Sequence, residues 1–334
     1  MDALGLVNAA FDLVVIVLLP AVALGAVMSA DLFKAIILFI TLGLLLALTW
    51  VRLAAPDVAL AEAAIGSGLM GALLLSARER LARTRPGRDR RTSHYPRWMT
   101  HPPPRRSHRA VSPWAASGLV LIAVAGLTAA VVTLPHEAAG LAPEVARQTP
   151  QRDLANQVTF VLLDARGYDT LLEIGVLLLA VAAVWSLGEA PEPPQNAAGP
   201  MLQGFVGTVG PIMVLVAGYL LWAGTDAPGG AFQAGVMLGA LGVLLSLAGR
   251  HPLARLPGWA LRLAVVSGPM LFLAVGVTMI GLGRHFLEYP QAHAKALILL
   301  IEATAMISIG VILVSLYAGG RPLSDESGTR KGRL

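Results

Sequence analysis

Residues 224–235 read GTDAPGGAFQAG, and long apolar stretches flank them on both sides. Proline followed by two glycines is typical of a turn, whereas each flanking stretch is long enough to be a membrane-spanning helix. We therefore expect a tight corner at which one spanning helix ends and the next begins. The residues expected to shape this corner are Gly224, Asp226, Pro228, Gly229, Gly230 and Phe232.

The helix expected after the corner carries Gly235 and Gly239, which are four positions apart and therefore share a face. Small residues at this spacing let another helix approach closely inside a membrane. The sequence thus predicts a close-packed hairpin whose stiff, small tip is suited to insertion between neighbouring subunits.

The composition excludes a soluble protein. The 334 residues are 56% hydrophobic and only 13% charged, and the mean hydropathy is +0.69. A soluble domain carries about 25% charged residues. Backbone groups in lipid must be hydrogen-bonded internally, and the apolar runs do not alternate, so we expect an all-α membrane protein.

The chain holds nine candidate spans, and the segment between the third and fourth contains eleven arginines. Basic loops stay on the cytoplasmic side, which predicts an outside N-terminus and a cytoplasmic C-terminus. The spans are expected at 7–28, 32–53, 57–77, 113–134, 170–188, 203–223, 229–248, 263–283 and 295–318.

Two linkers divide these spans into blocks of three, two and four helices: the arginine-rich segment and the proline-rich stretch GEAPEPPQNAAGP at 188–200. The expected organisation is a three-helix block at 1–77, a basic cytoplasmic linker at 78–112, a two-helix block at 113–190 with an outside surface segment at 135–169, a four-helix block at 201–319 and a cytoplasmic tail at 320–334. The surface segment includes DLANQVTFVLLD, whose apolar residues follow a helical stripe, so we expect a helix along the membrane surface. A short strand or a buried plug is the alternative.

Carboxylates inside the spans are the main candidates for function, because an ionisable group there costs about 2.5–3.5 kcal/mol to insert. Pro56 begins the third span and Asp57 lies in its first turn, where the helix dipole favours an anion, so we expect Asp57 to cap this helix. Glu62 lies deeper and is followed by small residues, which favours contact with a protein neighbour. The alternative for Glu62 is an ordinary interfacial acid.

Two further carboxylates lie at the start of the fifth span. Asp169 and Glu173 are four positions apart and share a helix face, with Asp169 expected to cap the helix and Glu173 one turn inside. Arg166 is near enough in sequence to pair with either. A local surface salt bridge is the alternative to a functional role.

The last span contains Glu302, which lies on roughly the same face as Lys295, seven positions earlier. This pattern allows either a structural pair between subunits or a proton site.

No motif indicates an enzyme, a cofactor or a metal site. The chain has no cysteine, which excludes disulfides and thiolate metal sites, and its seven histidines show no ligand spacing. Phosphate-binding, dinucleotide-binding and hydrolase motifs are also missing from the sequence. The arginine-rich linker suits anionic lipid better than nucleic acid, so we expect no nucleic-acid partner.

Three stretches resemble known families. GTDAPGGAFQAGVMLGALGVLL resembles the PGGGF signature of the Mrp antiporter B subunit, with Ala231 in place of the usual third glycine. DLFKAIILF followed by LAAPDVALAEAAIGSGL resembles the small three-helix subunit of membrane-bound hydrogenases (MbhD-like), which is equivalent to part of the C-terminal end of the Mrp A subunit. NQVTFVLLDARGYDTLLEIGVL resembles the next piece of that end (MbhE-like), usually written VDFRGFDTLGEI, with Ala165, Tyr168 and Leu172 departing from it.

The resemblance implies a subunit of an Mrp-type complex that exchanges sodium for protons in the inner or cell membrane of a bacterium or archaeon. The family's membrane acids carry over as Glu62 and Glu173, in the route of sodium ions or protons. No pumping domain precedes the first span and no lysine lies at mid-membrane, so we expect this chain to act only with other subunits and lipid. A subunit of a redox-driven complex related to complex I, or a purely structural scaffold, remains the alternative.

Overall fold

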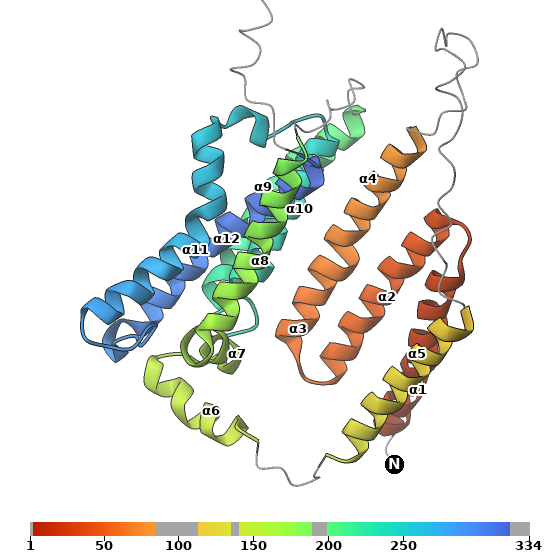
Figure 1. Ribbon diagram of the computed structural model, residues 1–334, viewed down its shortest axis with the longest axis horizontal. Coiled ribbons are helices and arrows are strands. Elements are labelled where there is room, and N and C mark those ends of the chain that lie inside the picture. Colours follow the sequence, from red (N-terminus) through yellow and green to blue (C-terminus); the bar gives the residue numbers. More distant parts are fainter. Residues whose placement is uncertain (1–2, 84–112, 135–139, 189–198, 321–334) are drawn as a thin grey trace, which may run out of the picture. The chain divides into compact units, whose positions relative to one another are not determined.

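The structure is a computed structural model that describes residues 3–83, 113–134, 140–188 and 199–320 (Figure 1). All regular secondary structure in these residues is helical, as predicted. Within the described ranges, seven helices are long and apolar enough to cross a membrane. The chain divides into two compact units, one formed by Met1–Leu81 with Glu144–Leu334 and the other by Ala82–Pro143. The predicted linker beyond Arg83 and the tail from 321 onward lie outside the described residues.

The first unit begins with three spans. Helices α1 (Ala3–Met28) and α2 (Leu32–Arg52) pack together and are joined by an ion pair of 2.7 Å between Arg52 and Asp12. The third span consists of α3 (Pro56–Ala61), the π-helix η1 (Glu62–Leu69) and α4 (Met70–Arg83). Helix α2 lies so close to η1 that a Cβ on Gly43 would come within 2.9 Å of the Ser67 nitrogen.

The described part of the segment before the fifth predicted span is helical, so the short strand considered there as an alternative is wrong. It contains α6 (Ala142–Gln148), η3 (Thr149–Arg152), α7 (Gln157–Thr159) and the π-helix η4 (Phe160–Ala165), and it leads into α8 (Gly167–Ser186). Phe160 and Leu163 are buried in the main apolar core, whereas Val158 and Leu162 are 40% and 42% exposed. Part of the segment therefore belongs to the core.

The C-terminal part of this unit surrounds the most buried helix. It comprises α9 (Pro200–Ala223), α10 (Ala231–Leu247), η5 (Leu253–Arg255), α11 (Gly258–Gly281), η6 (Gln291–His293) and α12 (Ala294–Ala318). Helix α12 packs against α8, α10 and α11, and α10 also packs against α9 and η1 (Figure 1). Helix α10 thus connects the C-terminal helices to the third span.

Glycines make the contact between α10 and α12 close. A Cβ on Gly235 would come within 2.9 Å of the Ile309 side chain, and one on Gly239 within 3.0 Å of Leu313. The glycine face that the sequence predicts for close helix contact is therefore covered by α12 of the same chain.

The second unit contains α5 (Pro113–Val132), whose large apolar side chains from Leu119 onward are exposed. Helices α5 and α10 correspond to two of the predicted spans. Their apolar stretches, Gly118–Val132 and Ala231–Leu247, are shorter than those of the seven long helices among the described residues. Helix α10 is shorter than predicted because the corner occupies the first residues of the expected span.

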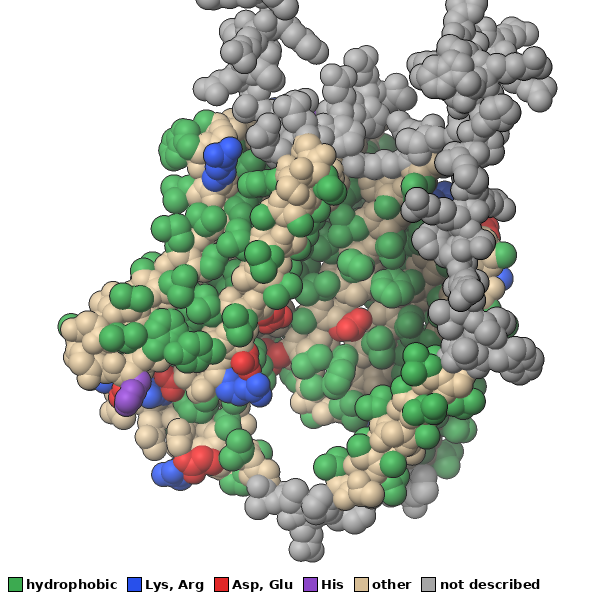
Figure 2. Space-filling view, viewed as in Figure 1, with side chains coloured by type: hydrophobic (Ala, Val, Ile, Leu, Met, Phe, Trp, Pro, Cys, Tyr) green, Lys and Arg blue, Asp and Glu red, His purple; other side chains and the backbone are tan. Residues whose placement is uncertain are grey.

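Apolar side chains are spread over the described helices on the face drawn in Figure 2. Leu119, Leu215 and Leu179 are each about 70% exposed, and many other large apolar side chains are also open. Contiguous apolar surface of this extent is incompatible with water and fits contact with lipid or with other membrane subunits. The chain is therefore a multi-pass membrane protein.

Candidate functional site at the corner between two helices

The corner between α9 and α10 is tighter than an ordinary helix connection. The Gly230 N–H donates to the Leu220 carbonyl at 2.9 Å, which ties the start of α10 back to the last turn of α9. Gly230 has a φ of 111°, in the region that favours glycine. A Cβ on Gly224 would come within 2.6 Å of the Gly230 backbone, and one on Gly229 would collide with the Leu220 carbonyl. The three glycines are therefore sterically required.

Asp57 reaches this corner from the third span. Its side chain is buried, and Oδ1 accepts hydrogen bonds from the Gly229 N–H at 3.1 Å and from Asn156 Nδ2 at 3.3 Å. Gln233 Nε2 also donates to the Asp57 carbonyl at 3.2 Å. The expectation that Asp57 caps its own helix is wrong, because Ala55 is the N-cap residue and no side chain caps α3. The carboxylate instead binds an amide that the glycine-rich turn leaves free.

Asn156 is the residue that joins the most segments at the corner. Its Nδ2 donates to the carbonyls of Ala227 at 2.9 Å and Gly224 at 3.1 Å, besides the bond to Asp57. Its Oδ1 accepts from the Val158 N–H at 2.8 Å and so caps α7. The side chain thus uses both its donor and its acceptor capacity, as a buried amide requires.

Sequence reasoning missed Asn156. Its position just before an apolar helical run is a signal of a helix N-cap, but the contacts across the chain leave no local signal. Asp57 and Asn156 of the same chain hold the corner. Its insertion between neighbouring subunits stays a prediction.

Glu302 supports the corner from α12. Its side chain is buried, with the whole residue 4% exposed, and Oε1 accepts a hydrogen bond from the Ala231 N–H at 3.3 Å, at the positive end of α10. Its Oε2 is buried and has no hydrogen-bond partner among the described residues. A Cβ on Gly230 would come within 2.8 Å of Oε1, which is a second reason for glycine there.

Within the chain, Glu302 does not pair with Lys295. Lys295 Nζ instead forms an ion pair with Asp226 at 3.0 Å, at the outer rim of the corner. Burial alone would raise the pKa of Asp226, but the hydrogen bonds from Lys295 and Thr225 outweigh burial and lower it below 3.8. Because Asp226 lies in the corner rather than at the helix start, it does not cap α10, whose N-cap residue is Gly230.

The remaining predicted acids do not take part in the hydrogen bonds of the corner. Glu62 is half-buried at the start of η1, and its carboxylate lies against Gly66, so that a Cβ there would overlap Oε1. Glu173 is exposed on α8. Asp169 pairs with Arg166 instead of capping α8, whose N-cap residue is Arg166. Arg166 therefore forms an ion pair with Asp169, one of the two acids predicted as its possible partners.

A second polar cluster was not predicted. Arg152 forms an ion pair of 3.1 Å with Asp164 and donates to the Tyr289 carbonyl at 2.8 Å. Burial raises the pKa of the Asp164 carboxyl even though Arg152 lies beside it. Tyr289 is fully buried, and its hydroxyl has no partner among the described residues. This cluster ties η3 and η4 to the segment before α12. Among the residues that the structure describes, no group of three or more His, Asp or Glu could hold a metal ion.

Comparison with known proteins agrees with this organisation. Residues 17–83 match the MbhD family model, which describes a component of MBH, and residues 201–319 match a domain related to the MnhB subunit of Na+/H+ antiporter. No curated protein matches the chain significantly.

A solved structure has the same fold. A chain of the Mrp complex from Dietzia sp. DQ12-45-1b aligns with a TM-score of 0.67 at 24% identity, covering 93% of this chain and 35% of that chain. The present chain thus spans about a third of the length of the chain it resembles. It is built from a part that matches the MbhD model, followed by a part that matches the domain related to the MnhB subunit.

Proposed function

We propose that this chain is a non-catalytic membrane subunit of an Mrp-type cation/proton antiporter complex, with no enzyme activity and no cofactor of its own. The observation that carries the proposal is the order of two matched domains on one chain whose fold follows a chain of a solved Mrp complex over 93% of its length. The other subunits of such a complex are its proposed partners, together with lipid, sodium ions and protons.

The proposed topology has nine spans, an outside N-terminus and a cytoplasmic C-terminus, in the inner or cell membrane of a bacterium or archaeon. Support comes from the seven long apolar helices and from α10, whose 17 residues extend about 26 Å. This length is close to the thickness of the hydrocarbon core of a bilayer, which is about 30 Å. We propose that these spans form three blocks in chain order, which are MbhD-like (1–77), MbhE-like (113–190) and MrpB-like (201–319).

The proposed ion or proton path uses Glu62 and Glu173, with Asp57, Asp169 and Glu302 as further members. The Glu62 side chain has no hydrogen-bond or ion-pair partner among the described residues, and Glu62 begins a π-helix, a rare element that is frequent at functional sites. Glu173 is exposed on a spanning helix, where lipid contact would be costly. A neighbouring subunit that covers Glu173 would remove this cost and complete a polar passage.

Purification tests this proposal directly. The tagged chain, extracted from its native membrane in mild detergent, is expected to carry other Mrp-type subunits, identified by mass spectrometry. Vesicles reconstituted with this material are expected to show proton movement that depends on a sodium gradient. A chain that purifies alone from the native membrane would contradict a role as a subunit.

A redox-driven complex is the second candidate, because residues 17–83 match the MbhD family model, which describes a component of MBH. The same purification separates the two candidates. Hydrogenase or iron–sulfur subunits among the co-purifying proteins would favour the redox-driven complex, whereas antiporter subunits without them would favour the antiporter.

A further inference from the structure

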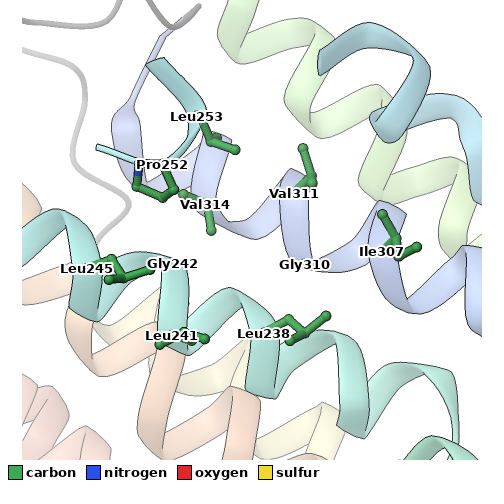
Figure 3. Close-up of a pocket in the computed structure, with 10 residues that line it drawn as sticks. All are labelled: Leu238, Leu241, Gly242, Leu245, Pro252, Leu253, Ile307, Gly310, Val311 and Val314. Carbon is green, nitrogen blue, oxygen red and sulfur yellow. The ribbon is translucent and has the colours of Figure 1, made fainter. Parts of the chain in front are cut away.

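An open apolar groove lies between α10 and α12 and is closed at one end by the segment before α11 (Figure 3). Leu241 and Leu245 line it from α10, Ile307 and Val311 from α12, and Leu253 from the closing segment. Ile307 is 46% exposed, so the groove is open to its surroundings along α12.

The chain is basic where the groove ends. The Arg250 N–H donates to the carbonyl of Leu245 at 2.8 Å, which places Arg250 directly beyond a residue that lines the groove. Arg255 ends η5, two residues after Leu253, and Arg262 lies in the first turns of α11. All three arginines are exposed, and none forms an ion pair with another described residue.

The surrounding sequence offers these arginines no acid. No aspartate or glutamate occurs from residue 227 to residue 287. Trp259, between Arg255 and Arg262, is 70% exposed. An exposed tryptophan beside basic residues at the end of a spanning helix is typical of the headgroup level of a membrane.

We propose that the groove and the adjoining arginines bind one anionic phospholipid, with an acyl chain between α10 and α12 and the phosphate at Arg250 and Arg255. Apolar leucine, isoleucine and valine side chains suit the acyl chain, and the uncompensated positive charge suits the phosphate. Basic pockets between spanning helices bind anionic headgroups in this way. The inference rests on the membrane placement proposed above but not on ion transport.

Lipid retention tests the proposal. The full chain is incorporated into vesicles of phosphatidylcholine with a small fraction of phosphatidylglycerol that carries a photoreactive acyl chain, irradiated, and digested for mass spectrometry. Cross-links are expected on α10 and α12 within the groove. Replacing Arg250 and Arg255 by glutamine should lower the cross-linked fraction by about fivefold for each arginine removed. The substitution Ile307→Trp, which fills the groove, should lower it as well.

Two matched variants serve as controls. Arg284→Gln removes an exposed arginine beyond the other end of α11, and Leu273→Trp enlarges an exposed apolar side chain on α11 that does not line the groove. Both should retain the lipid. The proposal is overturned if the arginine variants retain as much lipid as the unchanged chain, if excess phosphatidylcholine displaces the probe as well as excess phosphatidylglycerol does, or if the cross-links lie on other helices. Because the assay reads lipid and not flux, its failure would leave the proposed transport role standing.

Discussion

At the scale of single residues, the corner depends on the buried side chains of Asp57 and Asn156, which hydrogen-bond to each other and to the corner's backbone. Asn156 holds two carbonyls of the corner and the Asp57 carboxylate with its Nδ2, and it caps α7 with its Oδ1. A buried donor or acceptor left without a partner costs about 1–3 kcal/mol. Removal of this one amide would therefore take the Asn156 donor from the Ala227 carbonyl and leave Asp57 Oδ1 with the Gly229 N–H and the Gly224 carbonyl with the Thr159 hydroxyl.

The substitution Asn156→Ala is expected to lower the free energy of unfolding by about 2–4 kcal/mol, because it leaves the Asp57 carboxylate and two carbonyls short of a donor. Thermal denaturation of the purified chain in detergent, followed by circular dichroism, measures the effect. Gln151→Ala is the matched control, since Gln151 is exposed and makes one long hydrogen bond of 3.5 Å. Equal melting temperatures for the two variants would contradict the account of Asn156.

The ion pair between Asp226 and Lys295 gives the corner a pH dependence of known sign. The pKa of Asp226 is lowered below 3.8 in the folded chain. The stability that the ionised carboxylate gives the folded chain is therefore fully present above pH 3.8 and is lost as the pH falls through the lowered pKa. The melting temperature of Asp226→Asn should therefore fall less than that of the unchanged chain between about pH 6 and about pH 3. Lys295→Gln should behave in the same way, and an unaltered pH profile in both variants would show that the pair contributes nothing.

At the scale of elements, the corner is defined by what surrounds its glycines. Gly224, Gly229 and Gly230 each lie where a Cβ would meet backbone or a carboxylate within 3 Å. The sequence predicts the turn correctly because Pro-Gly-Gly has no stable place inside a helix.

Gly230→Ala is expected to destabilise the chain by about 1–3 kcal/mol, because alanine would take a strained φ of 111° and press on the Glu302 carboxylate. Gly218→Ala on α9 is the control, since no atom lies within 4 Å of its Cβ position. Chemical denaturation in mixed micelles compares the two. A loss of stability in Gly218→Ala as large as that in Gly230→Ala would mean that helix propensity, not the corner, is responsible.

Hydrophobic length predicts the spanning helices well, since it reflects the thickness of a membrane. It does not predict the two π-helices, because Glu62–Leu69 and Phe160–Ala165 have the same apolar pattern that an α-helix would have. It also placed the start of α10 before Ala231, because glycine and alanine count as apolar whether they lie in a helix or in a turn.

At the scale of the whole molecule, the corner connects all three sequence blocks. Asp57 comes from the first block, Asn156 from the second, and Gly229 and Glu302 from the third. Asp57 and Gly229 are 172 positions apart, so no local pattern could have paired them. The sequence could name the acids as candidates, but only the fold separates Asp57 and Glu302, which hold the corner, from Glu62 and Glu173, which do not.

A chain divided between Arg90 and Arg91 and expressed as two pieces is expected to remain associated, because the first block holds the corner through Asp57. A tag on the first piece should recover the second in equal amount after detergent extraction. Asp57→Ala combined with Asn156→Ala should reduce this recovery. Asp12→Ala should not, because Asp12 pairs with Arg52 inside the first piece. Loss of the second piece from the unsubstituted pair would contradict the interlocked arrangement.

The central claim is that membrane carboxylates of this chain serve ion or proton transfer in a larger complex. The most direct measurement is sodium-dependent proton flux in vesicles that contain the purified complex, with Glu62→Gln and Glu173→Gln compared with Glu144→Gln, an acid outside the spans. We predict that each of the first two substitutions lowers the flux by about 100-fold or more with the complex intact, as expected when a proton-transfer group is removed, and that Glu144→Gln leaves it unchanged. Undiminished flux in both variants, with all subunits present, would contradict the claim and leave the chain as a structural scaffold.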